Sequence, residues 1–134
     1  MRVSMLVPLA IMATLPALAQ AETGQPFRIF FDWARPDISR DGEAVLGEVL
    51  AAYRRQRPSR VMIAGHSDRS GPQAHNLAAS RRRAEAVRAA LAAGGIPAAA
   101  ITVSAYGEAR PLVPTEDGVR EVQNRRVEIS FDQG

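Results

Sequence analysis

The chain has 134 residues, of which 17 are basic and 14 acidic, and it contains no cysteine. A domain of this size can bury an ordinary core, but it can have neither a disulfide framework nor thiol chemistry. The net charge of +3 is small and the two signs are interspersed, so we expect no nucleic-acid partner. All basic residues are arginine, for which codon bias in a GC-rich genome is the favoured explanation. The alternative is a guanidinium-rich surface for carboxylates or phosphates.

Residues 1–21 have the composition of a secretory signal peptide. Arg2 supplies a short positive segment, Val3 to Leu18 is almost wholly apolar or small, and Ala19-Gln20-Ala21 is a small-x-small cleavage site. The apolar stretch is too short and too rich in alanine to favour a membrane anchor, and no later segment is apolar enough to span a bilayer. Because no cysteine follows the cleavage site, we expect no lipid anchor. Residues 22–134 are then predicted to form one domain of a free extracytoplasmic protein.

The first part of this domain predicts a strand and a helix. Residues 27–32 (F-R-I-F-F-D) have the hydrophobic pattern of a strand, and a proline-containing loop follows. Ser39 can cap the next helix, which Pro58 ends. One face of this helix is apolar, formed by Val45, Leu46, Val49, Leu50 and Tyr53.

The remaining elements complete the order β-α-β-α-β-β. A buried strand begins at Val61 and ends near Gly65, and a second helix runs from Gly71-Pro72 to Gly94-Gly95 with Leu77, Ala84, Val87 and Leu91 at helical spacing. Residues 101–106 and 126–131 predict two further strands, separated by a long loop over residues 107–123. The predicted fold class is α+β: a two-layer α/β sandwich with a mixed four-stranded sheet and both helices on one face.

Asp68 and Arg83 are the main candidates for a binding site. Asp68 lies in the loop between the second strand and the second helix, and Arg83 lies near the same helix edge as Asn76 and Val87, which favours an inward orientation. Ligands of α/β folds tend to bind at the carboxyl ends of the strands. Two interpretations remain open: an internal Asp68–Arg83 salt bridge, or a zwitterion site in which Asp68 binds an ammonium and Arg83 a carboxylate.

Other chemistries fit this stretch less well. Residues 65–69 (G-H-S-D-R) sit where a nucleophile elbow would, but arginine replaces the second glycine of that motif. His66, Asp68 and His75 could be a metal cluster, yet zinc sites need several convergent ligands and these residues fall on a loop and a helix start. Arg81, Arg82 and Arg83 cannot form one phosphate-binding patch, because successive helical residues point about 100° apart. We therefore expect no catalysis, no metal and no cofactor.

Several ordered motifs resemble the OmpA-like peptidoglycan-binding domain family over residues 27–131. They are G-H-S-D-R-S-G-P (65–72), N-L-A-A-S-R-R-R (76–83), Y-G-E-A-R-P (106–111) and N-R-R-V-E-I (124–129). The family includes the C-terminal domains of OmpA-type porins, the Pal lipoproteins and flagellar stator proteins. The resemblance implies non-covalent binding of peptidoglycan, in the periplasm of a Gram-negative bacterium, through the diaminopimelate residue of the stem peptide. The far end of diaminopimelate carries an ammonium and a carboxylate on one carbon.

The same resemblance assigns the ligand-binding residues. The family's aspartate and arginine fall on Asp68 and Arg83, and its F-D pair falls on Phe31 and Asp32. The other implied ligand-binding positions are Ser67, Asn76, Ala79, Asn124 and Arg125.

The sequence departs from the family pattern at several of these places. Ser67 replaces the usual threonine and should keep the hydroxyl, whereas Ala79 replaces a common leucine and should shorten one apolar wall of the groove. The approach to the last strand, G-V-R-E-V-Q-N-R-R, is longer than usual. Two alternatives therefore remain beside wall binding: a module on this fold that binds an envelope protein, or an accessory subunit of a wall hydrolase. In each case we expect a periplasmic protein associated with the cell wall or the outer membrane.

Overall fold

The predicted element order is confirmed in the computed structural model, which describes residues 24–133. The predicted signal peptide lies outside these residues. The elements are β1 (Phe27–Phe30), α2 (Arg40–Gln56), β2 (Arg60–Gly65), α3 (Gln73–Ala93), β3 (Ile101–Ala105) and β4 (Arg126–Asp132), with short 3-10 turns η1 (Ala98–Ala100) and η2 (Val122–Asn124). Within the described residues, neither helix combines the length and the apolarity that crossing a membrane requires.

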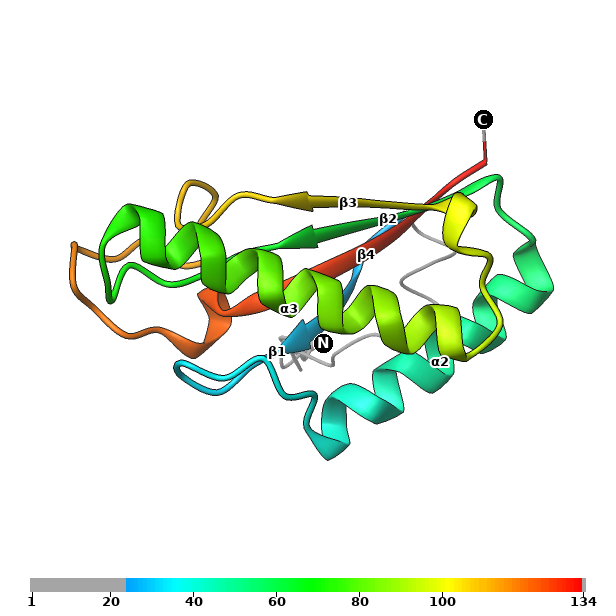
Figure 1. Ribbon diagram of the computed structural model, residues 1–134, viewed down its shortest axis with the longest axis horizontal. Helices are drawn as coiled ribbons and strands as arrows, with labels where there is room; N and C mark the ends of the chain where they lie inside the picture. The colour runs from blue at the N-terminus through cyan, green and yellow to red at the C-terminus, as the bar shows by residue number, and fades with distance from the viewer. Residues whose placement is uncertain (1–23, 134) are drawn as a thin grey trace, which may run out of the picture.

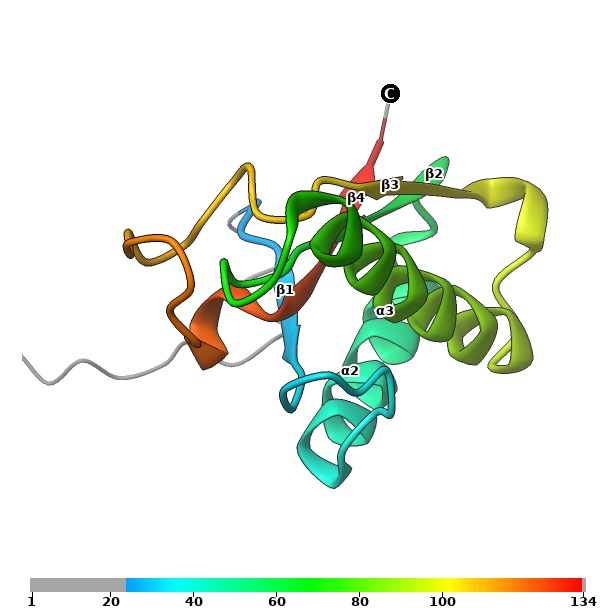
Figure 2. The same ribbon diagram turned by 60° about the vertical axis from the view of Figure 1, so that its left-hand side comes forward.

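The strands form one mixed sheet in the order β1-β4-β2-β3. β2 and β3 are parallel because α3 crosses over between them, and β4 lies antiparallel to both β1 and β2. Both helices cover the same face of this sheet, with α2 beside β1 and α3 beside β2 and β3 (Figures 1 and 2). The predicted α+β fold class is therefore confirmed.

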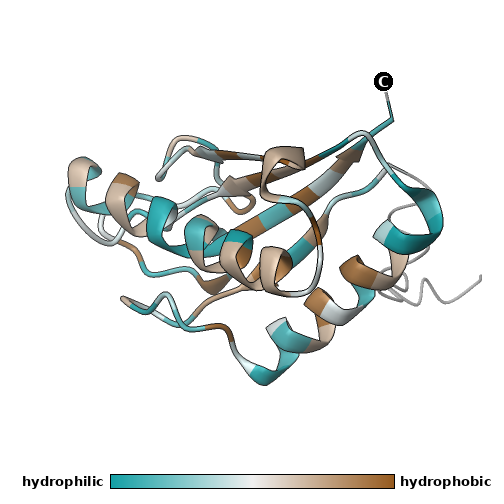
Figure 3. Ribbon diagram, turned by 45° about the vertical axis from the view of Figure 1, so that its right-hand side comes forward, coloured by the Kyte–Doolittle hydropathy of each residue, from teal (hydrophilic) through white to brown (hydrophobic). Residues whose placement is uncertain are grey.

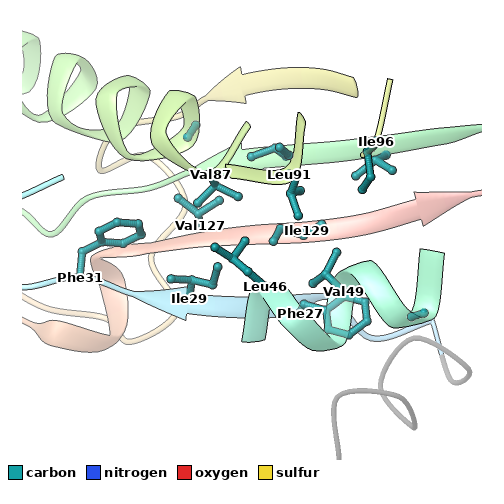
Figure 4. Packing of buried hydrophobic residues seen from close by; sticks show 14 residues of the cluster. Phe27, Ile29, Phe31, Leu46, Val49, Val87, Leu91, Ile96, Val127 and Ile129 are labelled. Atoms are coloured by element: carbon teal, nitrogen blue, oxygen red, sulfur yellow. The ribbon is translucent and has the colours of Figure 1, made fainter. Parts of the chain in front are cut away.

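The core lies between the two helices and the sheet (Figure 4). Alternate residues of the strands point toward the helices, as the period of a strand requires. Hydrophobic and hydrophilic residues accordingly alternate along β4 and around α2 (Figure 3). The largest buried side chains include Phe27, Ile29, Val49, Val61, Ile63, Val87, Leu91, Val127 and Ile129.

The predicted helix ends are confirmed for α2. The Ser39 hydroxyl oxygen accepts a hydrogen bond from the Gly42 amide (3.1 Å), which satisfies one free donor of the first turn. At the other end Arg57 adopts a left-handed conformation (φ 46°) and its amide bonds to the Tyr53 carbonyl oxygen. Pro58 follows directly and cannot extend the helix.

The predicted core stripe of α3 is wrong at one position, Leu77. Ala84, Val87 and Leu91 are buried, but Leu77 is 46% exposed. In the first turns the inward positions belong instead to Asn76 and Ser80, which are both buried. The reason is that this end of α3 extends beyond the end of β2, where polar loops rather than apolar strand residues lie beside it.

Gly65 brings the end of β2 against α3. A Cβ atom at this position would lie only 2.1 Å from the Ser80 carbonyl oxygen, so any other residue would force strand and helix apart. The chain then enters the loop that carries Asp68. This loop, the β1–α2 loop and the β3–β4 loop gather at one end of the sheet, on the left in Figure 1.

Candidate functional site

A cavity of about 420 Å³ opens at this end of the sheet, between the β1–α2 loop, the β2–α3 loop and the first turns of α3. It contains five of the predicted site residues: Ser67, Asp68, Asn76, Ala79 and Arg83. The rest of its lining is formed by Trp33, Ala34, Ser70, Gly71, Pro72 and His75. The structure therefore brings Asp68 and Arg83 into one concave site, as the sequence predicts.

Asp68 is a buried carboxylate with fixed partners. One carboxylate oxygen accepts hydrogen bonds from the amide (3.2 Å) and hydroxyl (2.6 Å) of Ser70. The other accepts from the Glu121 amide (3.1 Å) and from Arg125 (2.8 Å). Burial by itself raises the pKa of Asp68, but the hydrogen bonds from Ser70, Arg125 and Glu121 outweigh it and lower the pKa below its ordinary value. The group is therefore a rigidly held anion at neutral pH.

Arg83 is a buried cation whose protein acceptors are weak. It is 3% exposed, whereas its neighbours Arg81 and Arg82 are exposed, which confirms that one arginine of the triplet turns inward. Its N–H groups reach only backbone carbonyl oxygens, at 3.3 Å (Arg35), 3.5 Å (His66) and 3.4 Å (Asp32). No carboxylate of the described residues forms an ion pair with it.

The internal Asp68–Arg83 salt bridge is therefore not formed, because Asp68 pairs with Arg125 instead. Burial lowers the pKa of Arg83 to about 10, the positive charge of Arg125 adds to this effect, and the charge of Asp68 opposes it. Arg83 still carries its proton at neutral pH. The arrangement places a guanidinium with only neutral acceptors beside an ionised carboxylate, in a cavity open to a ligand.

Trp33 forms a wall of the cavity that the sequence reasoning missed. Its indole N–H donates to the Ser70 hydroxyl (3.0 Å), and that hydroxyl donates to Asp68. The guanidinium of Arg120 lies over the indole ring, 3.6 Å from its centroid. A sequence signal was present, because Trp33 is the single tryptophan of the chain and directly follows the first predicted strand. Ser70, which also lines the cavity, carried no comparable signal, and His75, another lining residue, was weighed from the sequence only as a metal ligand.

Comparison with known proteins identifies the family. The sequence model of the OmpA family matches residues 30–125. The chain belongs to the OmpA family. An outer membrane protein of Gluconacetobacter diazotrophicus is 39% identical over 77% of this chain and 29% of its own length. A peptidoglycan-associated lipoprotein of Legionella pneumophila is 40% identical over 61% of this chain and 47% of its own length.

The fold of this OmpA-family chain also matches solved structures. The peptidoglycan-associated lipoprotein of Burkholderia pseudomallei aligns with a TM-score of 0.71 and 27% identity, over 78% of this chain and 89% of that one. The three relatives are named as envelope proteins, and none of them carries the name of an enzyme. The chain spans less than half the length of the two sequence relatives.

Four predicted site residues of the OmpA-family domain lie outside the cavity lining. Phe31 is buried, with the Arg83 guanidinium 5.7 Å from its ring centroid. Asp32 is exposed and lines a neighbouring depression, and only its carbonyl oxygen contacts Arg83. Arg125 bonds to Asp68 and to the Phe31 carbonyl oxygen (3.0 Å). Asn124 is fully buried and bonds to the backbone of the β3–β4 loop. Arg125 and Asn124 thus position the site.

The two histidines lie in different environments. His66 is buried and stacks on Tyr106 (ring centroids 5.5 Å apart), and neither of its ring nitrogens has a hydrogen-bond partner among residues 24–133. Burial, with a contribution from Arg126, lowers the pKa of His66 to about 4, so the ring is neutral at pH 7. His75 is exposed at the cavity. Between residues 24 and 133, no group of three or more His, Cys, Asp or Glu side chains is arranged to hold a metal ion.

Proposed function

We propose that this protein binds peptidoglycan non-covalently, through the diaminopimelate residue of the stem peptide. The observation that carries the proposal is Arg83: a guanidinium buried beside a cavity, without a carboxylate partner among the described residues. Burying a charge without such a partner is costly, so its retention favours a partner that the ligand supplies. The ionised Asp68 lining the same cavity supplies the opposite charge.

Diaminopimelate fits this pair of charges. Its terminal carboxylate would accept paired N–H bonds from Arg83, and the ammonium on the same carbon would approach Asp68. The four hydrogen bonds to Asp68 hold its carboxylate in place and so reduce the conformational cost of binding. Because the site is partly shielded from water, both interactions would be stronger than at an open surface.

The family and the composition of residues 1–21 support a proposed cellular setting. Relatives of this chain are named as outer membrane proteins and peptidoglycan-associated lipoproteins. Residues 1–21 have the composition of a secretory leader. We propose that the domain acts in the periplasm, where it meets the cell wall directly.

The test is co-sedimentation of the purified protein with insoluble peptidoglycan. Wild type should sediment, and free diaminopimelate should release it. Asp68→Asn and Arg83→Met should stay in the supernatant, whereas Arg82→Met, which removes an exposed guanidinium from the same helix, should sediment like wild type.

Circular dichroism of each variant keeps this test independent of folding. Sedimentation of folded Arg83→Met at the wild-type level would refute the site assignment. A wild-type protein that stays soluble with peptidoglycan would refute wall binding itself. Binding that is insensitive to diaminopimelate but collapses with moderate salt would show a merely electrostatic surface.

A further inference from the structure

Beside the cavity, the guanidinium of Arg120 lies over the lining residue Trp33, and the binding of diaminopimelate does not use it. We propose that Arg120, held flat on Trp33, is a second carboxylate-binding group. Its ligand would be the free carboxylate of the residue that precedes diaminopimelate in the same stem peptide. This proposal rests on the proposed function and names a further part of the ligand.

Arg120 is anchored close to the primary site. The next residue, Glu121, donates its amide to the Asp68 carboxylate (3.1 Å). The backbone of Arg120 is thereby fixed next to a residue that bonds directly to Asp68, the group that would hold the ammonium. The proposal requires that the stem peptide leave the cavity on the side of this segment.

The Arg120 guanidinium is oriented before any ligand arrives. It stacks 3.6 Å from the centroid of the Trp33 ring, and Trp33 is itself fixed by its hydrogen bond to Ser70. Stacking occupies one face of the guanidinium and leaves its in-plane N–H donors free. Among the described residues, no acceptor takes a hydrogen bond or an ion pair from Arg120. A flat, pre-oriented guanidinium with free donors suits a carboxylate.

Among the described residues, two charged neighbours of Arg120 are engaged elsewhere. Arg69, in the adjacent loop, is paired with Glu108 and Asp117. The Glu121 carboxylate accepts a hydrogen bond from the Gln123 amide (3.2 Å) and does not pair with Arg120.

The test uses three small ligands in isothermal titration calorimetry: free diaminopimelate, γ-glutamyl-diaminopimelate, and the same dipeptide with the glutamyl α-carboxylate converted to an amide. Wild type should bind the acid dipeptide about tenfold more tightly than the amide, the size expected for one charge-assisted interaction. In Arg120→Gln this preference should fall to about one, while binding of free diaminopimelate stays at the wild-type level.

Arg110→Gln is the matched control. Arg110 stacks on Tyr106 at 3.7 Å, and neither residue lines the cavity. This variant should keep the preference for the acid dipeptide. Equal affinity of wild type for acid and amide, or a preference that survives in Arg120→Gln, would overturn the proposal and leave diaminopimelate binding intact. Absence of binding by all three ligands would overturn both.

Discussion

Arg83 and Arg125 both lie at the site, yet the structure predicts opposite consequences for their removal. Arg125 is the ion-pair partner of Asp68, and the two side chains are 11% and 3% exposed. Arg83 has no such partner in the part of the chain that the structure describes. We therefore compare Arg83→Met with Arg125→Met, since methionine has a similar length and no charge.

For Arg83 the opposing effects nearly cancel. A pKa lowered to about 10 corresponds to a cost of roughly 3 kcal/mol for keeping the charge in the folded state. The cavity is open to water, so we take about 2 kcal/mol. Methionine removes this cost but loses the contact with the Phe31 ring, worth about 1 kcal/mol, and the long hydrogen bonds to carbonyl oxygens, worth about 1 kcal/mol together. The free energy of unfolding of Arg83→Met should thus stay within about 1 kcal/mol of wild type.

For Arg125 the loss outweighs the relief that buried Arg83 gains when the neighbouring positive charge is removed. Methionine there would leave the Asp68 carboxylate buried without its cation, which typically costs about 3 kcal/mol or more. Urea unfolding, followed by the fluorescence of the single tryptophan Trp33, measures both variants in one assay. A loss above about 2 kcal/mol in Arg83→Met, comparable to that in Arg125→Met, would show that Arg83 is a structural residue and would refute the reasoning.

Other predictions concern stability alone. The pKa of His66 is about 4 in the folded protein and 6.5 in the unfolded chain, so the unfolded state binds the proton first as the pH falls. The free energy of unfolding should therefore fall by up to roughly 3 kcal/mol between pH 6.5 and pH 4. His66→Phe should flatten this pH dependence, and an unchanged slope in that variant would contradict the role of His66. Gly65→Ala should destabilise the protein by about 3 kcal/mol, because the new Cβ atom clashes with the Ser80 carbonyl oxygen. Gly47→Ala, in open space on α2, should instead stabilise it by up to about 1 kcal/mol. Thermal unfolding measures both variants, and similar melting temperatures would refute the close approach of β2 to α3 at Gly65. Arg57→Gly should stabilise the protein by about 0.5–1 kcal/mol, because glycine adopts a positive φ freely, whereas Arg57→Ala should leave the stability unchanged. Equal free energies of unfolding for the two variants, measured by urea denaturation, would count against backbone strain at this helix end.

The sequence was sufficient for the fold because its signals are local and agree with one another. Strand alternation, the Ser39 cap and the proline and glycine stops each fix one element, and a β-α-β unit then dictates a parallel pair. Leu77 shows the limit of periodicity. Its spacing is that of a core residue, but the sheet that would bury it has already ended.

The sequence by itself also determined the main pair of the candidate site. Asp68 follows a strand and Arg83 falls on the inward edge of the next helix, so short-range geometry is enough to place both near one crevice. The resemblance to the OmpA family added the remaining candidates, but a motif does not tell a residue that lines a cavity from one that supports it. Asn124 and Arg125 belong to the second kind.

Only the tertiary structure decided which charges pair. Asp68, Arg83 and Arg125 come from three separate segments, and whether Asp68 pairs with one arginine or the other depends on ångström-scale distances that no spacing encodes. The same holds for Trp33 and Arg120, which are far apart in the chain and meet because the β1–α2 and β3–β4 loops gather at one end of the sheet. Local patterns fix elements through short-range sterics and hydrogen bonds, whereas a binding site depends on long-range contacts that exist only once the core has closed.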